Sequence, residues 1–219
     1  MTLVIEPEYR ELFHDVVEDM YRFRHRIFVG LLGWSDIARE DGRDIDPYDH
    51  EHAVYFATVE NGEVVACSRL VPSLTPNICA TQFPEYANLR DIPRGPHIYD
   101  YSRFAVAADR YSPAECNRLK AMQVSSVFDY CVRRSITSCI SFTLAHTLPQ
   151  YVEMGIRATP LGLPVTMGDS TYVSVHFETT PEAYAKVLKL FGMKRSPLID
   201  PAEAGDRERA NFAIAGGPR

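Results

Sequence analysis

The feature that most constrains the fold is the dipeptide Asn61-Gly62, which separates two runs rich in β-branched and aromatic residues. Both residues tolerate a positive φ, and two-residue turns of this composition join antiparallel strands whose twist they match. The sequence therefore predicts a β-hairpin with strands at 53–60 and 63–71. Counting outward from the turn places the side chain of Arg69 on an apolar face of that hairpin.

Helical and extended patterns alternate along the rest of the chain. They predict one helix or a pair at 9–32, further helices at about 113–133, 148–154 and 181–191, and further strands at 98–106, 136–144, 158–165 and 172–177. This order predicts an α/β or α+β fold in which one central mixed sheet is covered by helices. We expect a single domain over residues 1–193 and a polar, mobile tail over 194–219.

Charge and hydropathy exclude several classes of protein. The chain holds 23 basic and 29 acidic residues, a net charge of −6, so no basic field would gather phosphates and no nucleic-acid partner is expected. No apolar run approaches the ~20 residues that cross a bilayer, and no signal peptide is visible, so we expect a cytoplasmic protein without a membrane partner. The five cysteines contain no C-x-x-C pair, which argues against disulfides and a thiolate zinc site.

An acidic segment at 44–52 invites a metal hypothesis, because it holds four carboxylates and two histidines. Read as a calcium loop that begins at Asp44, it fails at two positions. Its sixth residue is Asp49 where glycine is needed, and its twelfth is Tyr55 where glutamate is needed. We therefore expect no metal there.

Two arginines lie where apolar side chains would be expected. Arg24 belongs to the apolar stripe of the 9–32 pattern, and Arg69 to the apolar face of the hairpin. A buried guanidinium needs an acidic partner, and Asp44, Asp46 and Asp49 follow on the neighbouring loop. A solvated, charged surface loop is the alternative interpretation of the same three aspartates.

The combined pattern is more specific than any one of its parts. It runs Arg24-x-x-x-Phe28, Trp34, Asp44-x-Asp46-x-x-Asp49, Arg69-Leu-Val-Pro-Ser and Asp100-Tyr-Ser-Arg103-Phe. This pattern resembles the N-acyl-homoserine-lactone synthases, the LuxI-type autoinducer synthases of bacterial quorum sensing. The resemblance covers about residues 20–107 and weakens downstream toward Gly155 and Leu161-Gly-Leu-Pro164.

The resemblance implies a fold similar to the GNAT N-acyltransferases and a specific reaction. S-adenosylmethionine would be acylated on its amine by an acyl thioester, carried by coenzyme A or by acyl carrier protein. The product would then cyclise to an N-acyl-homoserine lactone and release methylthioadenosine, with no cofactor besides that substrate. The runs Asp41-Gly-Arg-Asp-Ile-Asp and Pro160-Leu-Gly-Leu-Pro favour a subgroup that takes aryl or branched acyl groups from coenzyme A.

The resemblance also assigns roles to residues. The catalytic set would be Asp100, as general base directly or through water, with Arg69 and Arg103. The set that holds S-adenosylmethionine would be Arg24, Phe28, Trp34, Asp44, Asp46 and Asp49. The acyl pocket would include Ser102, Phe104 and Thr143.

Two features of this chain depart from the family pattern or complicate it. The family usually has glutamate where this chain has Asp44 and Asp100, so both carboxylates reach one methylene less. Regular strand alternation also places Asp100 and Arg103 on opposite faces of the strand. Either the strand contains a bulge that lets both side chains act together, or the two residues have separate roles.

Three alternative interpretations of the sequence remain open at this point. A GNAT-type N-acyltransferase for another amine is one, although the glycine-rich pyrophosphate loop of that group is missing at 108–112. A ligand-binding module without catalytic activity is the second. The third is that the arginines and aspartates form a purely structural network.

Overall fold

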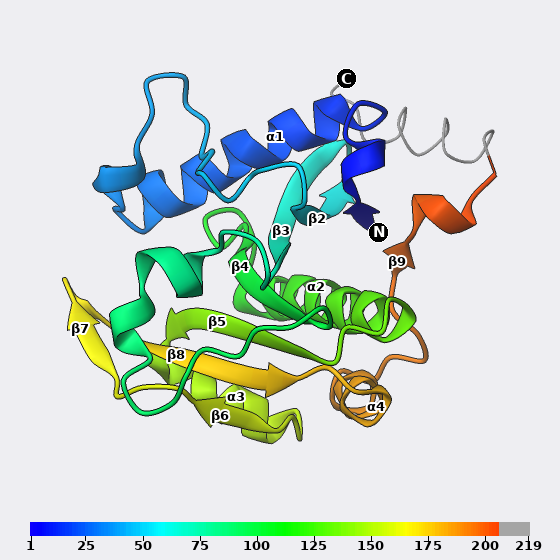
Figure 1. The fold of residues 1–219 in the computed structure, drawn as a ribbon. Helices are drawn as coiled ribbons and strands as arrows, with labels where there is room; N and C mark the ends of the chain where they lie inside the picture. Colours follow the sequence, from blue (N-terminus) through cyan, green and yellow to red (C-terminus); the bar gives the residue numbers. More distant parts are fainter. Residues whose placement is uncertain (206–219) are drawn as a thin grey trace. The chain divides into compact units, whose positions relative to one another are not determined.

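The computed structural model describes residues 1–205, which form two compact units, each assembled from several segments of the chain (Figure 1). The first unit contains residues 1–69, 103–126 and 197–205. The second contains residues 70–102 and 127–196. Two strands and one helix therefore contribute residues to both units.

The first unit is built on a sheet with the strand order β9-β1-β2-β3. Its elements are β1 (Thr2–Ile5), α1 (His14–His25), β2 (Val54–Glu60), β3 (Glu63–Pro72) and β9 (Leu198–Ile199). Strand β1 is antiparallel to β2 and parallel to β9, so the sheet is mixed. The turn between β2 and β3 has positive φ at Asn61 (53°) and Gly62 (83°), which confirms the predicted hairpin turn.

Helix α1 runs along strands β2 and β3 of the first unit (Figure 1). Its buried face includes Val16, Met20 and Arg24, in the three- to four-residue rhythm that the sequence shows. The helix does not end at its last α-helical residue. It continues as a π-helical stretch at Arg26–Leu31, an arrangement that is rare and common at functional sites. The predicted 9–32 helix is therefore two consecutive helical segments.

The second unit contains the rest of the sheet, with the order β6-β8-β5-β4 and with β7 also paired to β8. Its strands are β4 (Ile98–Val106), β5 (Ser138–Leu144), β6 (Ala158–Pro160), β7 (Val165–Met167) and β8 (Ser170–Glu178). Its helices are α2 (Pro113–Arg133), α3 (Leu148–Glu153) and α4 (Pro181–Leu190). Strands β4 and β5 are parallel, with a register that covers Ile98–Asp100, and β5 and β8 are antiparallel.

The two faces of the sheet in the second unit are covered differently. On one face, Phe177 of β8 contacts Phe128 of α2 and Tyr151 of α3. On the other face, Ile140 of β5 packs with Cys79 and Leu161, so the connection after β3 lies over the strands there.

The predicted mixed α/β class is confirmed, and strand 98–106 and helix 113–133 have the predicted bounds. The predicted strand at 158–165 is wrong, because the structure divides it into the short strands β6 and β7. Strand β9 lies inside the predicted tail and adds to the sheet of the first unit; residues 206–219 of that tail lie outside the described part of the chain. No helix within residues 1–205 is long and apolar enough to cross a membrane.

Candidate functional site

Three arginines and three aspartates of the first unit form one ion-pair network, and Arg24 is one of its two fully buried cations. Its Nε donates to Asp44 Oδ2 at 2.9 Å, and its two terminal nitrogens donate to Asp49 at 2.8 and 3.0 Å. The side chains of all three residues are at most 1% exposed. Helix α1 therefore carries a charge into its apolar stripe because the following loop brings carboxylates to meet it.

Arg69 of β3 and Arg103 of β4 complete the network. Arg69 donates to both oxygens of Asp46 at 2.6 and 3.0 Å and lies 2.8 Å from Asp49. Arg103 donates to both oxygens of Asp44 at 2.8 and 3.2 Å and lies 2.9 Å from Asp46. Each aspartate thus bridges two arginines, and the six charges sum to zero. Paired carboxylate contacts of this kind need the planar guanidinium, which lysine lacks.

Backbone hydrogen bonds hold the acidic loop in position against α1. The N–H of Asp44 donates to the carbonyl of Tyr21 at 3.0 Å, which fixes where the loop begins. The N–H of Asp46 donates to Asp49 Oδ2 at 2.9 Å, and the N–H of Tyr48 donates to Asp46 Oδ1 at 2.8 Å. These local turns are typical of aspartate and orient the carboxylates before any ligand is present.

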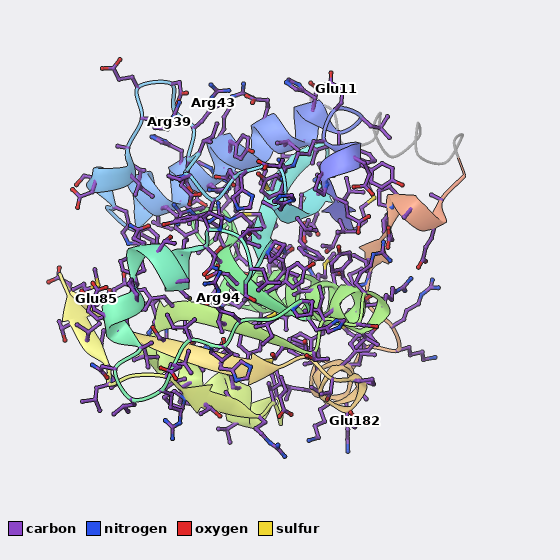
Figure 2. The ribbon with its side chains drawn as sticks, in the orientation of Figure 1. Glu11, Arg39, Arg43, Glu85, Arg94 and Glu182 are labelled. Atoms are coloured by element: carbon purple, nitrogen blue, oxygen red, sulfur yellow. The ribbon has the colours of Figure 1, made fainter. Side chains whose placement is uncertain are left out.

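The outer part of the same loop has separate partners. Figure 2 shows Arg39 and Arg43 projecting from it. Arg43 donates to Glu18 of α1 at 3.0 Å, and both arginines pair with the half-exposed Asp41. The loop is therefore attached to α1 on both sides of Asp44.

Opposing effects set the pKa values in the network. Burial alone would raise the pKa of Asp44, but Arg24 and Arg103 outweigh it, so this pKa lies below its ordinary value of 3.8. Burial would also raise the pKa of Asp49, but Arg24 and Arg69 outweigh it and hold this pKa well below 3.8. Burial opposes the charge of Arg24, yet Asp49 and Asp44 raise its pKa well above its ordinary value. Arg24, Asp44 and Asp49 are therefore ionised at neutral pH.

The exposed fractions of the side chains divide the network into a buried part and an accessible edge. The side chains of Asp46 and Arg103 are 13% and 10% exposed, whereas those of Arg24, Asp44, Asp49 and Arg69 are between 0 and 1% exposed. A ligand that reached the network would therefore meet one carboxylate and one guanidinium. An amino acid, with an ammonium and a carboxylate, has the complementary pair of charges.

An aromatic pair borders this edge. The rings of Phe28 and Trp34 are stacked, with centroids 4.9 Å apart and planes at 15°. The backbone N–H of Trp34 donates to the backbone carbonyl of Phe28 at 2.9 Å. The guanidinium carbon of Arg103 lies 5.4 Å from the centre of the Phe28 ring. Phe28 belongs to the π-helical stretch, whose wider turn contributes to placing this ring. Aromatic faces attract cations, and a sulfonium is a cation.

Strand β4 departs from regular geometry at Arg103, where φ is 55°. A residue other than glycine rarely adopts this left-handed conformation, and inside a strand it interrupts the alternation of side chains. The carbonyl of Arg103 accepts a hydrogen bond from the Cys67 thiol at 3.5 Å. The sequence-based argument required such an interruption for joint action of Arg103 and Asp100, and the backbone contains one.

Asp100 belongs to the second unit and is 1% exposed. Its Oδ2 accepts a hydrogen bond from the backbone N–H of Cys79 at 3.1 Å. Burial and the Asp100 carboxylate raise the pKa of the Cys79 thiol well above its ordinary value, so the thiol keeps its proton beside that carboxylate. Sequence reasoning missed Cys79. The only available signal was Asn77, which caps the helical turn of Cys79 by accepting from the Ala80 N–H at 3.0 Å.

The three residues predicted for the acyl pocket are all half-buried. Ser102 lies in the second unit, on β4 two residues after Asp100, and Phe104 lies in the first unit, next to Arg103. Thr143 lies on β5 of the second unit, with its hydroxyl 3.4 Å from that of Thr147. Because it follows Phe142, alternation directs Thr143 to the face of the sheet that α2 and α3 cover.

Comparisons with known proteins agree with this geometry. A solved N-acyltransferase from Pseudomonas aeruginosa, described as acting with acyl-CoA, matches with a TM-score of 0.55 over 80% of this chain and 97% of its own, at 11% identity. That match defines the class of fold, a GNAT-like acyltransferase fold. The model of the autoinducer synthase family matches residues 8–187. The chain therefore belongs to the autoinducer synthase family.

Two relatives show which members of that family are similar. An isovaleryl-homoserine lactone synthase from Bradyrhizobium diazoefficiens is 36% identical over 155 residues, which are 71% of this chain and 69% of the relative. The structure of a CoA-dependent acyl-homoserine lactone synthase, BjaI, with SAM and isopentyl-CoA has a TM-score of 0.84 at 29% identity and covers 98% of each chain. This chain is thus an acyltransferase of the acyl-homoserine-lactone synthase type, which confirms the resemblance seen in the sequence.

Proposed function

We propose that this chain makes an N-acyl-L-homoserine lactone from S-adenosylmethionine and an acyl-coenzyme A, in the cytoplasm, and releases methylthioadenosine. The observation that carries the proposal is the ion-pair network of three arginines and three aspartates, which leaves one carboxylate and one guanidinium accessible. Coenzyme A is the favoured carrier because the BjaI structure contains isopentyl-CoA and covers 98% of this chain. Acyl carrier protein is the alternative carrier.

The first unit would bind S-adenosylmethionine. Asp46 accepts from its ammonium and Arg103 donates to its carboxylate, because these are the accessible members of the network. Phe28 and Trp34 pack on the sulfonium and its substituents. The buried part of the network, which consists of Arg24, Asp44, Asp49 and Arg69, holds that edge in place and contacts no substrate.

The first chemical step is attack of the substrate amine on the thioester carbonyl. The amine attacks only as the free base, and Asp100 accepts the proton, directly or through water. Its carboxylate is held by the Cys79 N–H, and its shorter side chain makes the water-mediated route the simpler one. The tetrahedral oxyanion is stabilised by backbone N–H groups near the irregular position at Arg103. Collapse of that intermediate expels the coenzyme A thiolate, which takes up a proton.

The second step closes the lactone. The carboxylate of the methionyl moiety attacks its own γ-carbon, and the sulfonium sulfur leaves with the bonding electron pair as the neutral thioether methylthioadenosine. Both reacting groups belong to one molecule, so correct folding of the substrate supplies most of the rate enhancement. Arg103 can hold the carboxylate in the required orientation.

A product assay tests this proposal. The full chain is incubated with S-adenosylmethionine and with separate panels of acyl-coenzyme A and acyl carrier protein thioesters. Thiol release, methylthioadenosine and the lactone are each measured, the last two by mass spectrometry. The proposal predicts equal amounts of all three with a coenzyme A donor.

The matched control variants are Asp46→Asn, which changes the accessible carboxylate, and Asp41→Asn, which changes a half-exposed carboxylate of the same loop. Only the first is expected to lose activity. Absence of methylthioadenosine with every donor would refute the proposal, and activity confined to acyl carrier protein donors would refute the choice of carrier.

A further inference from the structure

Four aromatic side chains of the second unit form a continuous layer, which we call the aromatic layer and which consists of Phe83, Tyr86, Phe142 and Tyr172. The ring of Phe142 is central, with centroids 4.4 Å from Phe83, 5.3 Å from Tyr86 and 5.4 Å from Tyr172. The planes of Tyr86 and Tyr172 each lie at 16° to that of Phe142, so the three rings are stacked in parallel. All four side chains are half-buried, so the layer keeps accessible surface.

The aromatic layer is on the same face of the sheet as Asp100. Phe142 and Ile140 of β5 share a face by alternation, and Ile140 is the partner of Asp100 in the β4–β5 register. Phe142 also packs against the core cluster of Cys79, Ile140 and Leu161, on the face that the connection after β3 covers. The proposed base and the layer are therefore neighbours within the second unit.

Backbone contacts fix the segment that carries Phe83 and Tyr86. The carbonyl of Leu161 accepts from the N–H groups of Leu89 and Arg90, both at 2.9 Å. A Cβ on Gly162 would lie 1.9 Å from the Tyr86 carbonyl oxygen, so this close approach needs glycine. The rings are consequently held by a packed connection, and the surface they form exists before a ligand binds.

One buried hydroxyl beside the layer lacks a hydrogen-bond partner among residues 1–205. Ser174 pairs with Phe142 in the β5–β8 register and is 1% exposed. Its hydroxyl makes no hydrogen bond to any described residue, and the same holds for Nε2 of His176, two residues further on the same face. An unsatisfied buried hydroxyl is destabilising, and a hydrogen-bonding group of a ligand would remove that cost.

We propose that the aromatic layer binds the acyl group of the donor and that this group is aromatic, with a ring hydroxyl that hydrogen-bonds to Ser174. The inference rests on the proposed function and names the class of acyl group. Parallel rings present flat faces, which an aryl group stacks on and a branched or linear chain does not. Ser174 then distinguishes a hydroxylated ring from an unsubstituted one.

Initial rates with four donors test the proposal. The full chain is given saturating S-adenosylmethionine with 4-hydroxycinnamoyl-, cinnamoyl-, isovaleryl- or hexanoyl-coenzyme A, and methylthioadenosine is measured. We expect kcat/KM for the two aryl donors to exceed that of the two aliphatic donors about tenfold, with about fivefold more for the hydroxylated ring. A higher kcat/KM for isovaleryl- or hexanoyl-coenzyme A overturns the proposal and leaves the proposed function intact.

Two variants and a matched control locate the effect. Ser174→Ala is expected to lower the ratio of 4-hydroxycinnamoyl to cinnamoyl kcat/KM about fivefold. Phe142→Leu is expected to lower the ratio of aryl to aliphatic donors. Ser170→Ala makes the same chemical change at the start of the same strand, four residues before Ser174, and is expected to leave both ratios unchanged. An unchanged ratio in Ser174→Ala overturns the role of that hydroxyl.

Binding without turnover separates this proposal from the proposed function. Unreactive thioethers of coenzyme A that carry a 4-hydroxyphenylpropyl or an isopentyl group are titrated into the full chain by calorimetry. Tighter binding of the aryl thioether, by about fivefold or more, supports the aromatic layer even when no methylthioadenosine forms, and only the proposed function then fails. Equal or weaker binding of the aryl thioether overturns the aromatic layer as the acyl site.

Discussion

Replacing Asp49 by asparagine tests the buried part of the ion-pair network. The carboxylate accepts two hydrogen bonds from Arg24 and one from the Asp46 N–H, and it lies 2.8 Å from Arg69. The asparagine side chain is isosteric with the carboxylate, but it would leave three buried or nearly buried arginines with two carboxylates. Removal of one partner from a buried ion pair costs about 3–5 kcal/mol because the remaining charge is uncompensated.

For a chain of this length, such a loss lowers the unfolding midpoint temperature on the order of 10 °C. Thermal unfolding of the full chain, followed by circular dichroism, measures it. Asp41→Asn on the exposed side of the same loop is the control, and its midpoint is expected to stay within about 2 °C of the parent, because surface pairs contribute little. A midpoint for Asp49→Asn as high as that of Asp41→Asn would refute the inference that the network holds the loop in place.

Three further predictions concern the same residues and the buried thiols. Asp46→Asn is expected to raise the KM for S-adenosylmethionine about tenfold with a smaller loss of stability than Asp49→Asn, because one charge-assisted contact to the ammonium is lost; initial-rate kinetics and thermal unfolding measure the two effects. The folded-state pKa values of Asp44 and Asp49 lie below 3.8, so their stabilisation is complete at neutral pH and is lost as the pH falls below 3.8, which urea unfolding at several pH values measures. Burial raises the pKa of Cys67 to about 12, so native protein at about pH 8 is expected to resist iodoacetamide at this thiol until it unfolds, as peptide mass mapping can show. Uniform stability from neutral pH down to about pH 2 would contradict the second prediction, and rapid native alkylation of Cys67 the third.

Local chemistry explains why parts of the fold were predictable. The turn at Asn61-Gly62 requires positive φ, and the sequence supplies residues that adopt it. Helix α2 begins at Pro113 after Ser112, whose hydroxyl and N–H both bond to Glu115, so its start is encoded within four residues. Signals of this kind depend on neighbours in sequence and survive without tertiary context.

Other elements depend on contacts that the sequence does not display. Strand β1 has four residues and β9 has two, so neither offers enough periodicity to recognise. Strand β1 is stabilised by pairing with β2 and β9, and β9 by pairing with β1. The helical prediction for 9–32 was correct over residues 14–31, whereas residues 10–13 form turns, and hydrophobic spacing cannot distinguish an α-helix from a π-helical stretch at its end.

The candidate site shows the same division. The need of Arg24 and Arg69 for acidic partners followed from their apolar positions, and the structure pairs both with the expected loop. The contact of Asp100 with the backbone of Cys79 could not be predicted, because it joins residues 21 positions apart and the cap residue Asn77 indicates only the helical turn, not its partner. The aromatic layer was missed for a similar reason, since its four rings come from three separate segments.

The most direct test of the central claim is the stoichiometry of products formed from S-adenosylmethionine and an acyl-coenzyme A. The account predicts one methylthioadenosine and one N-acyl-homoserine lactone for each coenzyme A thiol released, and about tenfold less of each from Asp46→Asn when S-adenosylmethionine is below its KM. Thiol release that is not matched by methylthioadenosine would contradict it, because the acyl group would then have gone to water or would remain on S-adenosylmethionine that has not cyclised.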